Sequence, residues 1–223
     1  DAVMDMTKMG LFSGTGNGQF SPDKTMTRGE FLTVVVRYLF NDELQAMGAS
    51  PSDAHWADNA RIIALDKDII NNNEMPEGSM SKEITRQEMA MILVRASDTN
   101  GEKKPQQIHK SKIEDFDTIG TYYRNYVVDA ISRGLIAGTA TNEKNHSLTF
   151  TPRGVLTRGQ AATVLYRLIT PENRGTVDYT MPVYSTEIRD PQTWVEGEKH
   201  EKPKAGDTVI KADGTKVVLK VSN

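Results

Sequence analysis

Apolar positions recur along this chain at intervals of three and four residues, in segments separated by Gly-, Ser- and Pro-containing loops. This spacing is typical of amphipathic helices that bury one face. It predicts a mainly α-helical protein in which the helices come in pairs. The predicted apolar stripes are Phe31, Leu32, Val35 and Leu39; Ile62, Ile63, Leu65 and Ile69; Met89, Ile92, Leu93 and Ala96; Val127, Val128, Ile131 and Leu135; and Ala161, Val164, Leu165 and Leu168.

The same helix–loop–helix pattern occurs three times. Arg28 lies 18 positions after Gly10, and Arg86 lies 18 positions after Asp68. In the third copy the distance is 24 positions, because residues 141–148 hold an insertion. A single hairpin of this length cannot bury its apolar faces, so we expect the three copies to pack together. The equivalent positions are Gly10, Asp68 and Gly134 at the end of the first helix and Thr27, Thr85 and Thr157 before the second.

These repeats divide the chain into residues 1–45, 46–100 and 101–170, followed by a tail over 171–223. Four prolines interrupt the first part of the tail, and no helical period is present there. Near the end, Asp213-Gly214 separates two alternating apolar runs, which predicts a β-hairpin over 207–221. An isolated hairpin is marginal in water, so it either docks on the helices or begins a further domain.

The first repeat is expected to lack its opening segment. Trp56 and Tyr122 each lie 12 positions before the end of the first helix of their repeats, and the equivalent position in the first repeat would precede residue 1. Residues 1–5 have no basic region followed by an apolar stretch, so no signal peptide is expected there. We interpret the sequence as a mature fragment or an excised piece that begins inside a helix.

Composition and charge narrow the function. A net charge of −3 lacks the basic excess of a general nucleic-acid binder, and no apolar run approaches the length of a membrane-spanning helix, so neither nucleic acid nor membrane insertion is expected. The chain has no cysteine, which excludes disulfides, thiolate catalysis and Cys-ligated zinc. Its four histidines are scattered without metal-ligand spacing. We therefore expect no metal, no cofactor and no enzymatic activity.

Each second helix begins with a capping box, in which Thr caps the helix and Glu or Gln three positions later reaches back. An arginine follows the capping Thr each time, although the positive end of the helix dipole disfavours a cation there. The repetition indicates an anionic ligand, which helix amides and a guanidinium fork would bind together. By contrast, the arginines nearer the helix ends, where the dipole favours them, are interpreted as structural. The first set is Arg28, Arg86 and Arg158, and the second is Arg37, Arg95 and Arg167.

The loops add candidate ligand contacts. Gly14, Thr15 and Gly16 have counterparts in Gly138 and Thr139, and glycine lets a ligand approach the backbone closely. A tight turn that requires glycine is the alternative interpretation of each position. Trp56 and Tyr122 offer flat faces for a ligand, although either is equally consistent with a partly buried core aromatic.

Two stretches carry a resemblance to a known family. Residues 10–23, followed by Thr27-Arg28-Gly29-Glu30, and residues 134–138 with 150–152, followed by Thr157-Arg158-Gly159-Gln160, resemble the S-layer homology family. The resemblance covers about residues 1–170 and leaves the tail unexplained. It implies a pseudo-three-fold helical bundle with grooves between repeats, located at the bacterial cell wall.

The resemblance also implies non-covalent anchoring to an anionic secondary cell-wall polymer, often one that carries pyruvylated N-acetylmannosamine. Arg28, Arg86 and Arg158 would pair with the ketal carboxylate, and Gly14, Gly16 and Gly138 would contact the sugar. The second repeat departs from the pattern at residues 71–74, so its groove is expected to be degenerate despite Arg86. The rival hypothesis is a helical-repeat module for protein–protein interaction and self-association in a surface layer.

Overall fold

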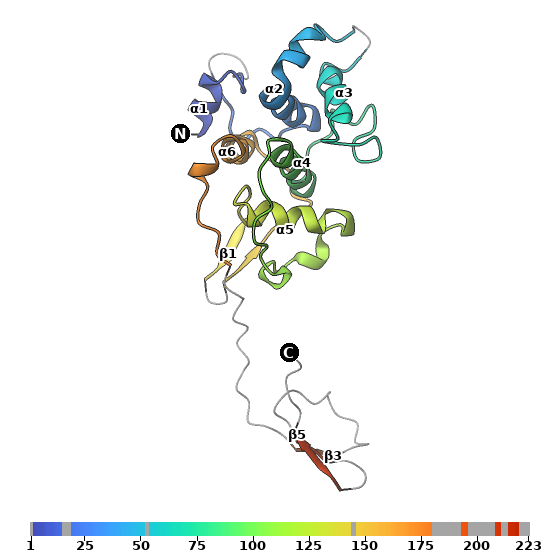
Figure 1. The fold of residues 1–223 in the computed structure, drawn as a ribbon, viewed down its shortest axis with the longest axis vertical. Helices are drawn as coiled ribbons and strands as arrows, with labels where there is room; N and C mark the ends of the chain where they lie inside the picture. Colours follow the sequence, from blue (N-terminus) through green and yellow to red (C-terminus); the bar gives the residue numbers. More distant parts are fainter. Residues whose placement is uncertain are drawn as a thin grey trace. The chain divides into compact units, whose positions relative to one another are not determined.

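We describe a computed structural model of the chain, over residues 2–14, 19–51, 54–143, 146–179, 193–195, 208–210 and 214–218. The chain divides into two compact units, Asp1–Val183 and Tyr184–Asn223. The first unit is mainly helical (Figure 1), and it spans the three segments that the sequence assigns as repeats. Its boundary with the second unit lies within the segment that the sequence assigns to the tail.

The described part of the first unit forms six α-helices, one short hairpin and four turns of 3₁₀-helix. The α-helices are α1 (Ala2–Lys8), α2 (Arg28–Ala46), α3 (Asp58–Asp66), α4 (Arg86–Thr99), α5 (Arg124–Ser132) and α6 (Arg158–Ile169). The strands are β1 (Ala140–Asn142) and β2 (Ser147–Thr149), and the 3₁₀ turns are η1 (Lys110–Lys112), η2 (Phe116–Thr118), η3 (Thr121–Tyr123) and η4 (Pro171–Asn173).

The predicted helix ends are confirmed. Thr27 and Thr157 cap α2 and α6 with reciprocal capping boxes, and Glu88 accepts the backbone N–H of Thr85 at the start of α4. After the first helix of each repeat the chain turns through the left-handed region, with φ of 71° at Gly10, 55° at Asp68 and 69° at Gly134. Aspartate tolerates this conformation better than most residues, which explains how Asp68 replaces glycine.

Helices pack mainly between repeats rather than within them. The second helix of one repeat lies against the first helix of the next, so that α2 contacts α3 and α4 contacts α5 (Figure 1). The same kind of contact joins the third repeat to the first, because α6 lies against α1. The apolar stripes of these helices form one continuous core, which includes Phe31, Met89, Leu93 and Leu165, all essentially inaccessible to solvent. The prediction was wrong for Ile62, which is 49% exposed.

Three short backbone segments meet inside this core. Met26 N–H donates to Leu156 O at 2.9 Å, Ile84 N–H donates to Met26 O at 3.0 Å, and Leu156 N–H donates to Ile84 O at 3.2 Å. These residues each precede a capping Thr, so equivalent positions of the three repeats form a closed ring of hydrogen bonds. All three side chains are buried, and their pairing satisfies backbone groups that would otherwise be costly to bury.

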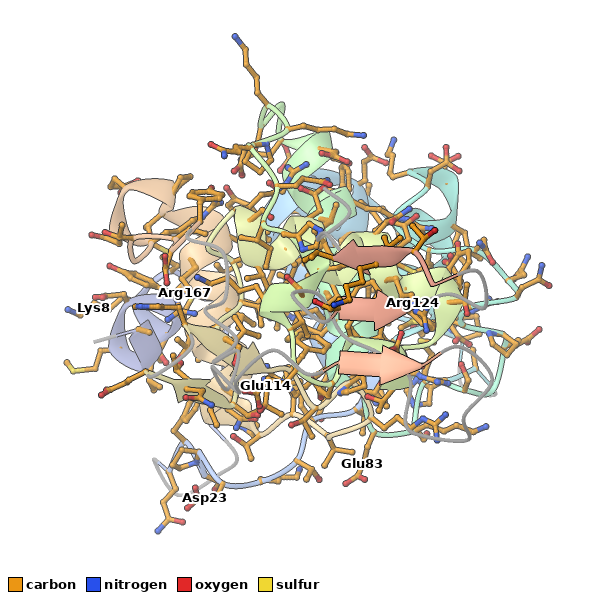
Figure 2. The ribbon with its side chains drawn as sticks, turned by 90° about the horizontal axis from the view of Figure 1, so that it is seen from below. Lys8, Asp23, Glu83, Glu114, Arg124 and Arg167 are labelled. Atoms are coloured by element: carbon orange, nitrogen blue, oxygen red, sulfur yellow. The ribbon has the colours of Figure 1, made fainter. Side chains whose placement is uncertain are left out.

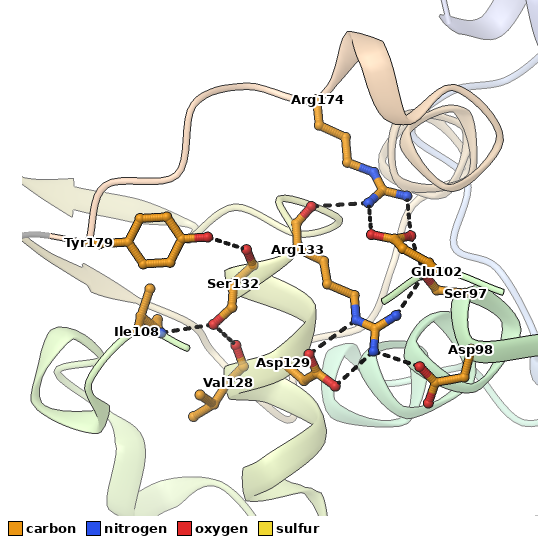
Figure 3. Close-up of polar contacts among 10 residues, drawn as sticks. All are labelled: Ser97, Asp98, Glu102, Ile108, Val128, Asp129, Ser132, Arg133, Arg174 and Tyr179. Carbon is orange, nitrogen blue, oxygen red and sulfur yellow. Dashed lines mark hydrogen bonds and ion pairs between the residues drawn. The ribbon is translucent and has the colours of Figure 1, made fainter. Parts of the chain in front are cut away.

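The insertion in the third repeat folds into the β1–β2 hairpin, which pairs Ala140 with Thr149. Residues 174–179, called the strap below, pack against the same repeat (Figure 3). Arg174 binds Glu102 and the carbonyl oxygen of Arg133, and the Tyr179 hydroxyl donates to Ser132 O at 2.8 Å. The first part of the predicted tail therefore belongs to the helical unit.

The described residues of the second unit form three short strands. The antiparallel pairing of β4 (Thr208–Ile210) with β5 (Lys216–Val218) matches the hairpin that Asp213-Gly214 predicts. A further strand, β3 (Thr193–Val195), pairs with β4 in parallel and was not predicted.

Charged side chains of both signs occur across the molecule. Figure 2 labels acidic Asp23, Glu83 and Glu114 as well as basic Lys8 and Arg167 within the helical unit. No helix among the residues that the structure describes has the length and apolar character needed to cross a bilayer.

Candidate functional site

The arginine at the start of each second helix contacts the loop of another repeat. Arg158, at the start of α6, donates from Nε to Phe20 O at 3.0 Å and from Nη2 to Ser13 O at 2.8 Å. Its guanidinium carbon lies 4.8 Å from the centre of the Phe20 ring. One guanidinium thus holds both ends of the first repeat's loop, and its side chain is almost fully buried.

Arg86 makes the same contacts with the third repeat. It donates from Nε to Phe150 O at 2.7 Å and from Nη2 to Ala137 O at 2.9 Å, and it lies 5.0 Å from the Phe150 ring. Burial lowers the pKa of Arg86, while the nearby Asp115 acts in the opposite direction. Arg86 therefore belongs with the loop of the third repeat, which corrects its expected association with the groove of the second.

Arg28 differs from its two counterparts. Its guanidinium forms an ion pair with Glu88, and its Nε is buried without a hydrogen-bond partner among the described residues. The loop that it faces has Gly78 at the position of Phe20 and Phe150, so it lacks the aromatic ring on which the other two arginines lie. The repeated motif arginines thus have two structural environments.

The helix amides that were expected to bind an anion donate hydrogen bonds to other groups of the protein. At the start of α6, Arg158 N–H donates to Lys24 O at 2.8 Å and Gly159 N–H to Pro22 O at 2.9 Å, while the next amide, Gln160 N–H, donates to Thr157 Oγ1 at 3.3 Å. The starts of α2 and α4 have equivalent bonds to loop carbonyls. The interpretation of these N-termini as free anion sites is therefore wrong, because neighbouring loops satisfy them.

Several predicted residues nevertheless meet at one open cavity of about 270 Å³, which we call groove 1. Gly14, Arg158 and Trp56 all line it, from three different repeats. Trp56 is 57% exposed, so its ring remains accessible to a ligand. Thr15 and Gly16 lie outside the described residues. Groove 1 is also lined by Lys24, Glu30 and Arg37.

Gly138 and Thr139 have roles within the third repeat. A Cβ atom at Gly138 would lie 2.9 Å from Thr149 O and 2.9 Å from the Leu148 side chain, so the hairpin packs too closely for any other residue. Thr139 N–H and its hydroxyl both donate to Thr149 O. Gly138 also lines a separate cavity of about 190 Å³ beneath the strap, with Arg167 and Asp178.

The corresponding region of the second repeat is filled by protein. Arg95 Nη1 and Nη2 each lie 2.8 Å from a carboxylate oxygen of Glu74, and the Tyr122 hydroxyl donates to the same carboxylate. Burial opposes ionisation of Glu74, but the hydrogen bonds from Arg95, Tyr122 and Asn71 outweigh it and lower the pKa of that carboxyl. Tyr122 is 53% exposed, nearly as much as Trp56, but its hydroxyl is hydrogen-bonded within this cluster.

This cluster predicts an acid-labile contribution to stability. Because the pKa of Glu74 is lower in the folded protein than its ordinary value of 4.5, the contribution is fully present above that value and is lost as the pH falls through the folded-state pKa. We expect Glu74→Gln to reduce stability at pH 7 and to flatten its decline below pH 4.5. Urea unfolding across this range measures both effects, and equal slopes in the two proteins would contradict the assignment.

Sequence reasoning missed several residues at these sites. Lys24 belongs to no repeated motif. Arg37 and Arg95, by contrast, each lie nine positions after the arginine that follows the capping Thr, and this repetition could have marked them as candidates. Aligning the loops also places Glu74 opposite Gly16, a comparison that marks the second loop as chemically different. In the part of the chain that the structure covers, no group of three acidic or histidine side chains is arranged to hold a metal ion.

Comparison with known proteins shows which family and which proteins this chain resembles. The S-layer homology domain model matches residues 1–32 and 112–162. The chain is 31% identical over 198 residues to the surface-layer 125 kDa protein of Lysinibacillus sphaericus, which covers 86% of this chain and 15% of that protein.

Two similar relatives carry the names of enzymes. Exoglucanase XynX of Acetivibrio thermocellus is 30% identical over 179 residues, which cover 78% of this chain and 16% of the relative. Amylopullulanase of Thermoanaerobacterium thermosulfurigenes is 30% identical over 175 residues, or 76% of this chain and 9% of the relative. The chain therefore spans only a small part of each of these proteins, and the similarity extends to a surface-layer protein that is not named as an enzyme.

Proposed function

The chain belongs to the S-layer homology domain family, and we propose that it is a non-catalytic module that binds an anionic secondary cell-wall polymer. The family and the surface-layer relative indicate a cell-surface anchoring domain located at the cell wall. The further proposal is that the polymer carries an acidic sugar, such as pyruvylated N-acetylmannosamine, and that groove 1 receives it.

Groove 1 carries this proposal, because it combines an exposed aromatic ring with cationic side chains around one open cavity. A sugar ring presents an apolar face that packs on an aromatic side chain, and its acidic substituent requires a cation. Arg158 lines groove 1 and is held in place by two loop carbonyls through Nε and Nη2. A guanidinium fixed in this way loses little rotamer freedom when it binds a ligand.

We also propose that residues 1–45, 46–100 and 101–170 are three repeats of one pseudo-three-fold bundle. The closed ring through Met26, Ile84 and Leu156 supports this arrangement, as does the cyclic pairing of helices. In such a bundle the arginine of one repeat completes the groove of the next. Arg28, Arg86 and Arg158 would then serve three grooves that differ in what occupies them.

Trp56→Ala is expected to weaken polymer binding about twofold to tenfold, because a stacking contact of this kind contributes about 0.5–1.5 kcal/mol. Stability should change little, since the ring is mostly exposed. Trp56→Phe retains an aromatic face and should retain most of the affinity. Titration of each variant with purified polymer measures the effect, and unchanged affinity in Trp56→Ala would remove this ring from the site.

Cosedimentation with cell walls tests the function itself. The chain should sediment with walls that carry a pyruvylated secondary polymer and remain in solution with walls from which that polymer has been extracted. Equal sedimentation with both preparations would refute polymer binding. Binding to a protein of the surface layer, with no affinity for the polymer, would favour the protein–protein alternative.

A further inference from the structure

A second set of arginines has equivalent positions in the three repeats. Arg37 donates from Nη1 to Leu11 O at 3.1 Å, and Arg95 donates from Nη1 to Ile69 O at 3.1 Å. Leu11 and Ile69 each follow the left-handed residue that ends the first helix of their repeats. Equivalent backbone carbonyls, Leu11 O and Ile69 O, therefore accept from the same guanidinium nitrogen in the two repeats.

In the second repeat this guanidinium holds a carboxylate. Glu74 accepts one hydrogen bond from each terminal nitrogen of Arg95, both at 2.8 Å, in the two-pronged geometry that suits arginine and carboxylate. The Tyr122 hydroxyl donates to one of the same oxygens. The side chain of Glu74 is only 5% exposed, so the carboxylate fills this corner of the second repeat.

In the first repeat the equivalent corner is open. Arg37 is half-buried and lines groove 1 together with Trp56, which occupies the sequence position of Tyr122. The residue aligned with Glu74 is Gly16, which has no side chain to supply a carboxylate. An arginine oriented like Arg95 thus faces a cavity of about 270 Å³ in place of an internal acid.

We propose that Arg37 binds the carboxylate of the ligand in groove 1. In the second repeat, the Glu74 carboxylate occupies the equivalent position on Arg95 and thereby prevents a ligand from binding there. This inference rests on the proposed polymer binding and identifies the residue that recognises the acidic group. Arg37, interpreted from sequence as structural, then has two roles, since it braces Leu11 O and offers its remaining donors to the ligand. Arg158 holds the loop whose residues 11–14 line the same groove.

Arg37→Gln is the direct test, with Arg95→Gln as the matched control. Both changes remove a guanidinium that braces the equivalent carbonyl, but only Arg37 faces the open groove. The probes are pyruvylated N-acetylmannosamine and the same sugar without pyruvate, titrated calorimetrically. We expect Arg37→Gln to bind the acidic sugar at least tenfold more weakly and to prefer it less strongly over the unsubstituted sugar. Arg95→Gln should retain the wild-type affinity and the wild-type preference. Arg37→Lys should retain an intermediate preference.

Glu74→Ala tests the second half of the inference. Removing the internal carboxylate should expose Arg95 and add one bound equivalent of the acidic sugar relative to the wild type. Wild-type binding that survives unchanged in folded Arg37→Gln would overturn the role of Arg37, and an unchanged stoichiometry in Glu74→Ala would overturn that of Glu74. Failure of the wild type to prefer the acidic sugar would instead overturn the proposed function, and this inference with it.

Discussion

Arg158→Ala is expected to lower the free energy of unfolding by about 2–4 kcal/mol and to abolish ligand binding in groove 1. The almost fully buried guanidinium satisfies two partly buried loop carbonyls at once, and a buried polar group left without a partner costs about 1–3 kcal/mol. The stacking of the guanidinium on Phe20 is lost as well. Without this brace the loop from Ser13 to Phe20 loses the contact that joins its two ends.

Arg86→Ala and Arg28→Ala provide the comparison for this experiment. Arg86 makes the equivalent two contacts with the third repeat, so its loss should cost a similar amount. Arg28 pairs with Glu88 instead of bracing a loop, and we expect a smaller loss of stability. Urea unfolding and sugar titration of the three variants separate the effects. Equal stability losses in all three, or full binding by Arg158→Ala, would contradict this division.

Arg133→Ala is expected to be more damaging, with a loss of about 3–5 kcal/mol. The Arg133 side chain is inaccessible to solvent and is bonded to Asp129 at 3.1 Å, to Asp98 at 2.6 Å and to the Ser97 hydroxyl at 2.9 Å (Figure 3). Removing the cation leaves the carboxylate of Asp129 buried beside an empty space. Most of the penalty comes from this unpaired charge rather than from the lost attraction.

A double variant distinguishes these causes. Arg133→Met with Asp129→Leu removes both charges and keeps apolar volume, so it should recover much of the stability that Arg133→Met alone loses. Thermal and urea unfolding of the single and double variants give the coupling between the two residues. Additive losses would show that Arg133 stabilises the third repeat by packing alone.

Local signals in the sequence predict the helix starts, because capping depends on residues that are close together in the chain. Thr27 and Glu30 bond to each other across only three positions of the chain. The left-handed turn at Gly10 is equally local. By contrast, the contact between α1 and α6 joins the first and third repeats, and no spacing within either helix specifies that partner.

The buried arginines show why the candidate site was only partly predictable. The unfavourable position of Arg158 relative to its helix dipole is visible in sequence, and an external anion was the simplest explanation. The observed contacts are neutral carbonyls of a loop more than 130 positions away in the chain. The strap was missed because its residues have no period, and it is held by Arg174 and Tyr179 through bonds to groups that are distant in sequence.

Calorimetric titration of the intact chain with pyruvylated and unsubstituted N-acetylmannosamine tests the central claim most directly. Polymer recognition through groove 1 predicts saturable binding that requires the acidic group and is lost in Arg158→Ala, with Arg28→Ala retaining it. Equal affinity for the two sugars, or no affinity for either by the folded wild-type chain, would contradict the proposed function.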